Sequence, residues 1–421
     1  MLRAFIDAFK IPDLRKKILF TLFIIMVYRL GAFLPIPNIN LDQLGNLGGR
    51  QGIAAFINLF SGGALSNFAI FALGIMPYIT SSIIMQLLAV VIPKLEQWRK
   101  EGEVGVKKIT QWTRYLTVTL ALLQSTGLIF LFNNQNPGIV RVFTPPRVIF
   151  MVIVLTAGTA LIMWLGELIT QRGIGNGMSI LIFTSVVSSL PSQGTILFRQ
   201  LSTVQFAVIV ALGVGIIAAV VFMEQGQRRI PVQYAKRVVG RRMTSGGSTY
   251  IPLKVNQSGV IPIIFASSVL YFPTLLGSVV QWQGFQRFIN NVLLNQGHPV
   301  YILVFGLLVV FFAYFYTAIT FNPVDTADNI RKYGGFIPGI RPGQPTADYL
   351  SRILNRITLP GSLFLATIAL IPSIFFALWL VNPNQFPFGG TSILIVVGVA
   401  LETSKQLESQ LTMRHYEGFL R

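Results

Sequence analysis

The sequence predicts an all-α polytopic membrane protein with ten transmembrane helices. Of its 421 residues, 53% are hydrophobic and only 11% are charged, less than half the charge that a soluble domain usually carries. Apolar stretches approach the length of about 20 residues that crosses a bilayer, and charged connections separate them. The predicted spans are 18–34, 69–92, 114–132, 148–166, 178–190, 205–222, 259–280, 300–320, 359–381 and 390–404.

The first apolar stretch is interpreted as a membrane span and not as a cleavable signal peptide. Pro35 and Pro37 stand directly after the run 18–34, where a small-residue cleavage site would be needed. Two later stretches fit the span criteria least well. The run 178–190 is short, and the run 390–404 is interrupted by polar residues.

Lysine and arginine are unequally divided between alternate connections, and this division orients the chain. One set of connections, together with both termini, holds 27 of the 33 basic residues; the other holds five, and Arg29 lies inside the first span. Cytoplasmic loops of membrane proteins carry an excess of these residues. Both termini are therefore predicted to be cytoplasmic, with most of the net charge of +19 on that face.

The spans lack the residues that membrane chemistry and ion coupling require. The chain has no cysteine, its two histidines (His298 and His415) lie in polar connections, and no Gly-Lys dipeptide of a P-loop occurs. Arg29 is interpreted as extending its long side chain toward the outer membrane surface. We expect no metal, no cofactor and no enzymatic activity, so the energy for transport must come from a partner.

A short apolar segment, 53–66, precedes the second span. It is too short to cross a bilayer and is broken by Gly62 and Gly63. Irregular backbone at membrane depth is tolerated only where protein buries it or where it lines a cavity. Two interpretations are equally favoured: a re-entrant element beside a transport path, and a helix on the outer surface.

The second and seventh spans share a short pattern. Residues 77–82 and 262–267 both read P-x-I-x-x-S, at equivalent places in two halves of five spans each, 18–195 and 196–404. Because five is odd, the second half enters the membrane from the opposite side, so a repeat would be inverted. A chance match over six positions is the alternative.

The connection 331–343 is rich in glycine and proline and is predicted to form neither helix nor sheet. Pro338 and Pro342 restrict the residues before them to extended backbone. Arg341 is therefore expected at a stiff, exposed bend suited to insertion into a partner. The alternative is that Arg341 serves only as one of the cytoplasmic charges that orient the chain.

Six stretches of the sequence, in matching order, resemble the SecY family of protein-conducting channels. They are NLFSGG (58–63), FALGIMPYI (71–79), GIGNG (173–177), RRIPVQYAKRVVGRR (228–242), GVIPIIFASS (259–268) and GGFIPGIRPG (334–343). The resemblance implies an hourglass channel with two pseudo-symmetric, inverted halves and a lateral gate toward lipid. Its cytoplasmic parts would be 1–17, 224–258, 321–358 and 405–421.

The resemblance also assigns roles to residues by motif. A ring at the waist of the channel would consist of Ile75, Ile79, Ile182, Val186, Ile264 and Ile395; ordinary helix packing is the alternative for each. The plug, 53–66, would carry the motif residues Asn58, Leu59, Phe60, Ser61, Gly62 and Gly63. The lateral gate would include Ser82, Gln86, Ser267, Ser268 and Phe272. Docking of a motor or ribosome would use Arg341, Arg241, Arg242, Arg237 and Lys236.

The function implied by the resemblance is translocation of unfolded precursor proteins across the bacterial inner membrane, and insertion of membrane proteins into it. The implied partners are the subunits SecE and SecG, the SecA ATPase, signal sequences, membrane lipids and the ribosome. The basic loop 224–258 suits the phosphates of ribosomal RNA. A small-solute permease is the alternative class.

Overall fold

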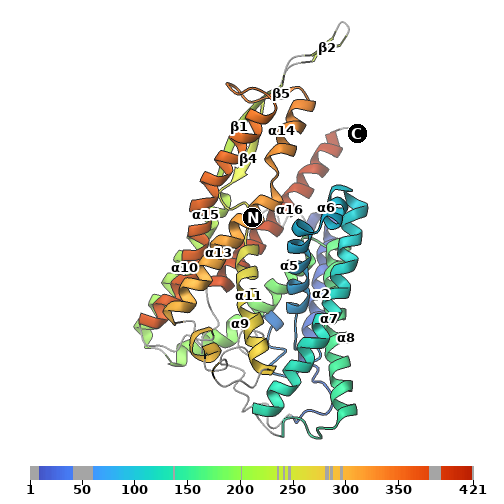
Figure 1. The fold of residues 1–421 in the computed structure, drawn as a ribbon, viewed down its shortest axis with the longest axis vertical. Helices are drawn as coiled ribbons and strands as arrows, with labels where there is room; N and C mark the ends of the chain where they lie inside the picture. Colours follow the sequence, from blue (N-terminus) through green and yellow to red (C-terminus); the bar gives the residue numbers. More distant parts are fainter. Residues whose placement is uncertain are drawn as a thin grey trace.

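The chain forms a bundle of long helices with a small β-sheet projecting from one end (Figure 1). The computed structural model describes residues 9–40, 60–135, 138–200, 202–234, 237–239, 242–244, 248–279, 284, 288–293, 297–378 and 390–419. Within them, one helix overlaps each predicted span. These helices are α2 (Pro12–Phe33), α5 (Met76–Val91), α7 (Glu103–Gln135), α8 (Pro145–Arg172), α9 (Gly177–Gln200), α10 (Thr203–Gln225), α11 (Ile261–Val279), α13 (Pro299–Thr320), α15 (Gln344–Leu378) and α16 (Gly390–Phe419).

Fewer spans are identified by length and hydropathy alone than there are helices overlapping the predicted spans. Among the described residues, five helices are long and apolar enough by themselves to cross a membrane: α7, α8, α10, α13 and α15. A sixth span results if α5 is joined to α6 (Pro93–Lys100), which is bent from it by 99°. The helix α16 is apolar only in its first half, because charged residues such as Lys405 and Glu408 fill its second half.

Helix starts follow from local sequence. Proline stands in the first turn of α2, α5, α8 and α13, where its missing N–H costs no intrahelical bond. Ser202 caps the start of α10. Its hydroxyl accepts a hydrogen bond from the backbone N–H of Gln205, and the side-chain oxygen of Gln205 accepts one from the backbone N–H of Ser202. This reciprocal capping satisfies two amides that the helix cannot pair internally.

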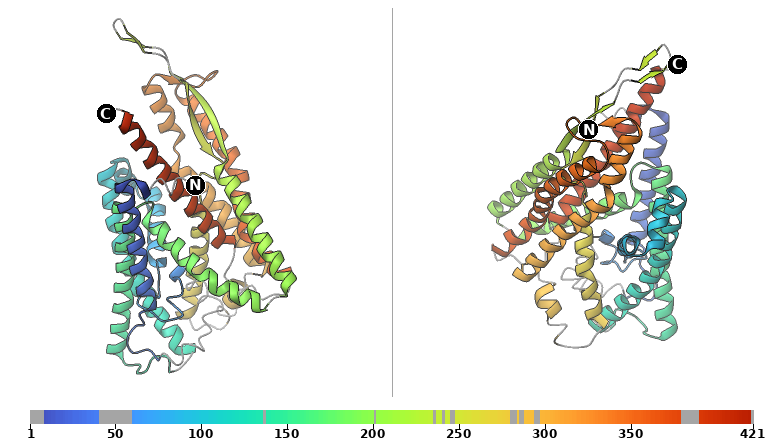
Figure 2. Two further views of the ribbon diagram at one scale, coloured as in Figure 1. Left: turned by 180° about the vertical axis from the view of Figure 1, so that it is seen from behind. Right: turned by 45° about the horizontal axis from the view of Figure 1, so that its top comes forward.

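The helices pack in two groups that meet through a few contacts. The helix α2 packs on α8 and α9, while α7 packs between α5 and α8; separately, α13 packs between α11 and α15, and α16 packs on α10 and α15. The groups contact each other where α11 meets α5 and α7, and where α9 meets α10 and α16. Figures 1 and 2 show the helices α2, α7 and α8 standing apart from α10, α13 and α15. Segments distant in sequence therefore meet between the groups.

The outward surface of the bundle is apolar, as contact with lipid requires. On α2, the exposed side chains include Phe23, Met26 and Leu30, and on α13 they include Leu303 and Leu307. In water such faces would be unfavourable, because each exposed apolar side chain costs roughly 1.5–3 kcal/mol relative to burial. Hydrocarbon removes that cost.

The chain before α5 is not helical over the range predicted. The expected span 69–92 is wrong at its start, since residues 62–75 form turns and α5 begins only at Met76. The backbone at Phe68 and Gly74 has positive φ, a conformation that a helix cannot include. Ile36 N donates to Phe68 O at 3.0 Å, and Ile70 N donates to Leu34 O at 2.9 Å. These bonds fix the segment against the end of α2.

The bundle is all-helical as predicted, and a small β-sheet is added to it at one end. The strand β1 (Gln227–Tyr234) pairs with β4 (Ser248–Lys254) on one side and with β5 (Gly335–Phe336) on the other. The prediction of no sheet within 331–343 is therefore wrong at β5, where two residues suffice to pair with an edge. The buried residues Ile230 and Val232 of β1 flank the exposed Pro231 and enter a small separate core with α14 (Pro323–Lys332) and α15.

Candidate functional site

The six residues predicted for the ring come from four helices that are far apart in sequence. Ile75 caps α5 and Ile79 lies one turn later, Ile182 and Val186 lie one turn apart on α9, and the others lie on α11 and α16. Every one of the six is at most 9% exposed, and all belong to one continuous apolar cluster. The tertiary structure thus brings aliphatic side chains from both helix groups into one core.

The plug segment is described from Phe60 onward, and Asn58 and Leu59 lie outside the described residues. Phe60 and Ser61 are almost completely buried. Gly74, which directly precedes Ile75, lies against them, because a Cβ on Gly74 would come within 2.9 Å of the Phe60 carbonyl oxygen and the Ser61 Cα. This end of the segment is therefore folded into the bundle, not laid on its surface as an exposed helix.

Arg29 does not extend to the membrane surface, and that interpretation is wrong. Its Nη1 donates to Gly62 O at 2.7 Å and to Ser188 Oγ at 2.8 Å. The guanidinium also lies 5.2 Å from the centre of the Phe33 ring. The side chain therefore points inward, where carbonyl and hydroxyl oxygens compensate its charge. Sequence reasoning lacked the signal for this, because the partners are 33 and 159 residues away.

The predicted gate residues lie on α5 and α11, and we call the contact of these two helices with each other and with α7 the seam. Gln86 Nε2 donates to Ser82 Oγ at 3.3 Å within α5, and Ser268 donates to the carbonyl of Ile264 within α11. Ser267 is buried. The side chain of Phe272 lies outside the described ones. Both of these hydrogen bonds lie within a single helix and do not cross the seam.

A serine that was not predicted joins α5 to α7 beside this seam. Ser81 Oγ lies 2.9 Å from Thr117 Oγ1 and donates to Thr113 O at 3.1 Å. All three residues are buried. Small hydroxyl residues allow helices to approach closely in membranes and supply interhelical hydrogen bonds. The helices α5 and α7 are thereby held together on one side of the seam.

A polar contact bridges the two helix groups where α5 and α13 end. Arg99 of α6 donates through Nη2 to Ile319 O, in the last turn of α13, at 2.5 Å. A cation suits a helix C-terminus, whose carbonyls are unpaired. The cavity there, about 720 Å³, is also lined by Glu96, Lys100 and Asp325. A hydrogen bond from Lys100, and then its charge, lower the pKa of Glu96.

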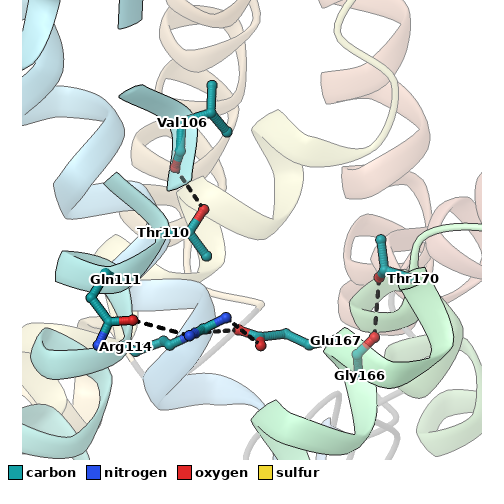
Figure 3. Close-up of polar contacts among 7 residues, drawn as sticks. All are labelled: Val106, Thr110, Gln111, Arg114, Gly166, Glu167 and Thr170. Carbon is teal, nitrogen blue, oxygen red and sulfur yellow. Dashed lines mark hydrogen bonds and ion pairs between the residues drawn. The ribbon is translucent and has the colours of Figure 1, made fainter. Parts of the chain in front are cut away.

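An ion pair fixes α7 to α8 (Figure 3). Arg114 donates through Nε and Nη2 to the two carboxylate oxygens of Glu167, both at 2.7 Å, and through Nη1 to Gln111 at 3.0 Å. The Glu167 side chain is 18% exposed and that of Arg114 is 37% exposed. Bidentate geometry with partial burial makes this pair stronger than a surface ion pair.

Glu167→Gln is expected to destabilise the purified protein by about 1–3 kcal/mol, because it leaves a half-buried guanidinium without its counter-charge. Thermal unfolding in detergent measures the effect. Glu103→Gln is the matched control, since Glu103 is 84% exposed and pairs with Lys107 within one helix. An equal change in the two variants would contradict a stabilising role for the buried pair.

The structure describes three of the five residues predicted for docking. Arg341 is exposed between β5 and α15, and its carbonyl accepts from Thr346 Oγ1 at 2.9 Å, which fixes the bend. Arg237 and Arg242 begin the short paired strands β2 (Arg237–Val239) and β3 (Arg242–Thr244). Lys236 and Arg241 lie outside the described residues.

The described part of the chain holds no group of three or more His, Asp or Glu side chains placed to bind a metal ion. The residues predicted for the ring are instead all aliphatic and buried. These features fit a multi-pass membrane protein of the channel class. They are buried aliphatic residues from two helix groups, an irregular segment folded against them and a seam between helices.

Comparison with known proteins agrees with that class. Residues 69–404 match the SecY family model. The chain is 56% identical to the protein translocase subunit SecY of Streptomyces galbus and 50% identical to that of Mycobacterium bovis, with 100% of both chains covered in each case. The chain belongs to the SecY family. It is a protein-conducting channel subunit of the bacterial cytoplasmic membrane and not an enzyme.

Solved structures have the same fold. A SecY structure, described as having a plug domain that stabilises the closed state and maintains a membrane seal, matches with a TM-score of 0.64 over 96% of each chain. The canine Sec61 protein in a ribosome–channel complex matches with a TM-score of 0.60 over the same shares. Both are only 17% identical to this chain, so these likenesses establish the fold alone.

Proposed function

We propose that unfolded polypeptides pass through the apolar centre of this bundle, between the two helix groups, and that transmembrane segments leave sideways through the seam of α5, α7 and α11. The observation that supports this proposal is that six aliphatic residues from α5, α9, α11 and α16 are all buried and belong to one continuous apolar cluster. Such a constriction offers water and ions no hydrogen-bond partner, so it can dewet and close.

The segment that includes Phe60–Gly63 acts as the plug of the closed channel. It lies next to the proposed ring on two sides, because Gly74 precedes Ile75 and contacts this segment, and because Gly62 lies against Ser185, the neighbour of Val186. A plug at this place blocks the path when no polypeptide occupies it. The SecY structure noted above is described as having a plug domain that stabilises the closed state, and the proposal carries that role over to this segment.

The driving energy comes from partners that dock on the end bearing the β-sheet. We assign SecA or the ribosome to this end, with Arg341 and the basic 224–258 loop as contacts, and SecE and SecG as companion subunits. Because β1 pairs with both β4 and β5, the two cytoplasmic loops form one unit. A partner bound to either loop therefore acts on both. Signal sequences and lipids meet at the seam.

The orientation is tested by single cysteines, since the native chain has none. Cysteines at Ser245 and Gln344 are expected to react with an impermeant thiol reagent only from the cytoplasmic side. Cysteines at Gln135 and Gln193 are expected to react only from outside. Reversed labelling of either pair would overturn the assignment of both termini to the cytoplasm.

Transport of a precursor protein into vesicles tests the function itself. The purified complex, reconstituted with SecA and ATP, is expected to protect the precursor from added protease. A small-solute permease would instead pass solutes without SecA and leave the precursor digestible. Omitting ATP is the control, because the chain supplies no energy of its own.

A further inference from the structure

The first helix holds the plug segment by two neighbouring side chains. As described above, Arg29 Nη1 donates to both the Gly62 carbonyl and the Ser188 hydroxyl. One guanidinium nitrogen thus joins α2, the plug segment and α9. Glycine is favoured at position 62, because its φ is +63° and a Cβ there would lie only 3.0 Å from Nη1.

Tyr28 makes a second connection between the same three elements. Its hydroxyl lies 2.6 Å from Ser185 Oγ and 3.4 Å from the carbonyl of Ser61. Tyr28 and Ser185 are both buried. The two consecutive residues of α2 therefore contact two consecutive carbonyls of the plug segment and two serines one turn apart on α9.

Compensation of the positive charge of Arg29 depends on these hydrogen-bond partners. Within the described part of the chain no carboxylate forms a salt bridge with it. Arginine does not lose its proton in proteins, so among the described residues the permanent charge is compensated by the neutral oxygens of Gly62 and Ser188. Moving the plug segment away would remove the Gly62 carbonyl from the guanidinium, and hydrogen bonds to a charged group are stronger than neutral ones.

We propose that Arg29 is the positioning residue that latches the plug segment in its closed place, with Ser188 as its anchor on α9. The inference rests on the proposed plug role of this segment. The latch joins the segment to α2 and α9, two helices of the same group, so it holds the closed state without crossing the seam. Opening must break the bond between Arg29 and Gly62.

Ion leak through the reconstituted complex tests the latch. Arg29→Leu is expected to raise the leak of potassium from vesicles, in the absence of precursor, by about tenfold or more, since loss of a charged hydrogen bond shifts the closed–open equilibrium by that factor. Arg29→Lys retains a charged donor and is expected to restore most of the seal. Leu30→Ala is the matched control on the same helix, because Leu30 is 62% exposed.

Ser188→Ala removes the anchor without altering any charge, so it tests the latch even if Arg29→Leu folds poorly. It is expected to raise the leak severalfold and to add little when combined with Arg29→Leu, because both changes break the same contact. Thermal unfolding of each variant shows whether the fold is retained. Tight vesicles with well-folded Ser188→Ala and Arg29→Leu would overturn the latch.

Deletion of residues 58–63 separates the latch from the plug. If the deletion leaves the channel sealed, the plug role fails. If it causes a leak while the two point variants stay tight, the plug role stands and the latch fails. The latch further requires that Arg29→Leu add nothing in the deletion background. If Arg29→Leu raised the leak of the deletion variant by the same factor as it raises the leak of the native channel, Arg29 would seal the channel by other contacts.

Discussion

Replacing Arg341 with glutamate is expected to reduce SecA-driven translocation about thirtyfold or more while leaving the amount of protein in the membrane unchanged. Reversing one charge of a close contact costs roughly 2–5 kcal/mol, and about 1.4 kcal/mol corresponds to a factor of ten. Arg341 is exposed at a bend held by Thr346, so the change disturbs a contact surface and no packed core. Translocation of a labelled precursor into vesicles, with membrane levels measured in parallel, is the assay.

Lys108→Glu is the control for this prediction. Lys108 is also a basic residue of a connection predicted to be cytoplasmic, but it is engaged with Glu101 at 3.0 Å in an exposed ion pair, and such pairs contribute little. We expect it to translocate nearly as well as the native chain. Equal, mild effects of the two reversals would mean that Arg341 is only an orienting charge and that the docking site lies elsewhere.

Asparagine at Ile79 or Ile264 is expected to open the closed channel to ions by roughly an order of magnitude. Each amide places donors and acceptors among buried aliphatic side chains, where an unpaired polar group costs roughly 1–3 kcal/mol. Hydration of the constriction removes that cost, so the open or wetted state gains in population. Export of precursors with defective signal sequences is expected to rise as well.

Two controls separate this effect from simple destabilisation. Ile79→Val keeps the constriction apolar and is expected to stay tight. Leu155→Asn places the same amide at a fully buried position of α8, outside the proposed ring, and is expected to lower the unfolding temperature without a leak. Tight, selective channels from folded Ile79→Asn and Ile264→Asn would remove these residues from the ring.

The sequence alone predicted the membrane class, and a helix of the structure overlaps each predicted span. Hydropathy and length are properties of single segments, so they do not depend on how the segments later pack. The ends of the segments were predicted less well, since helices such as α7 and α16 continue past their apolar parts into charged sequence. The start of α5 was missed because the turns at Phe68 and Gly74 look apolar in sequence.

Tertiary structure decided the contacts that give this protein its candidate site. The inward direction of Arg29 depends on Gly62 and Ser188, which arrive from other parts of the chain. The strand β5 forms because its backbone pairs with the free edge of β1, which lies about a hundred residues away in sequence. Hydrogen bonds and packing between distant segments leave no periodicity in the sequence. The residues could be named from a family motif, but only the folded chain shows what each one touches.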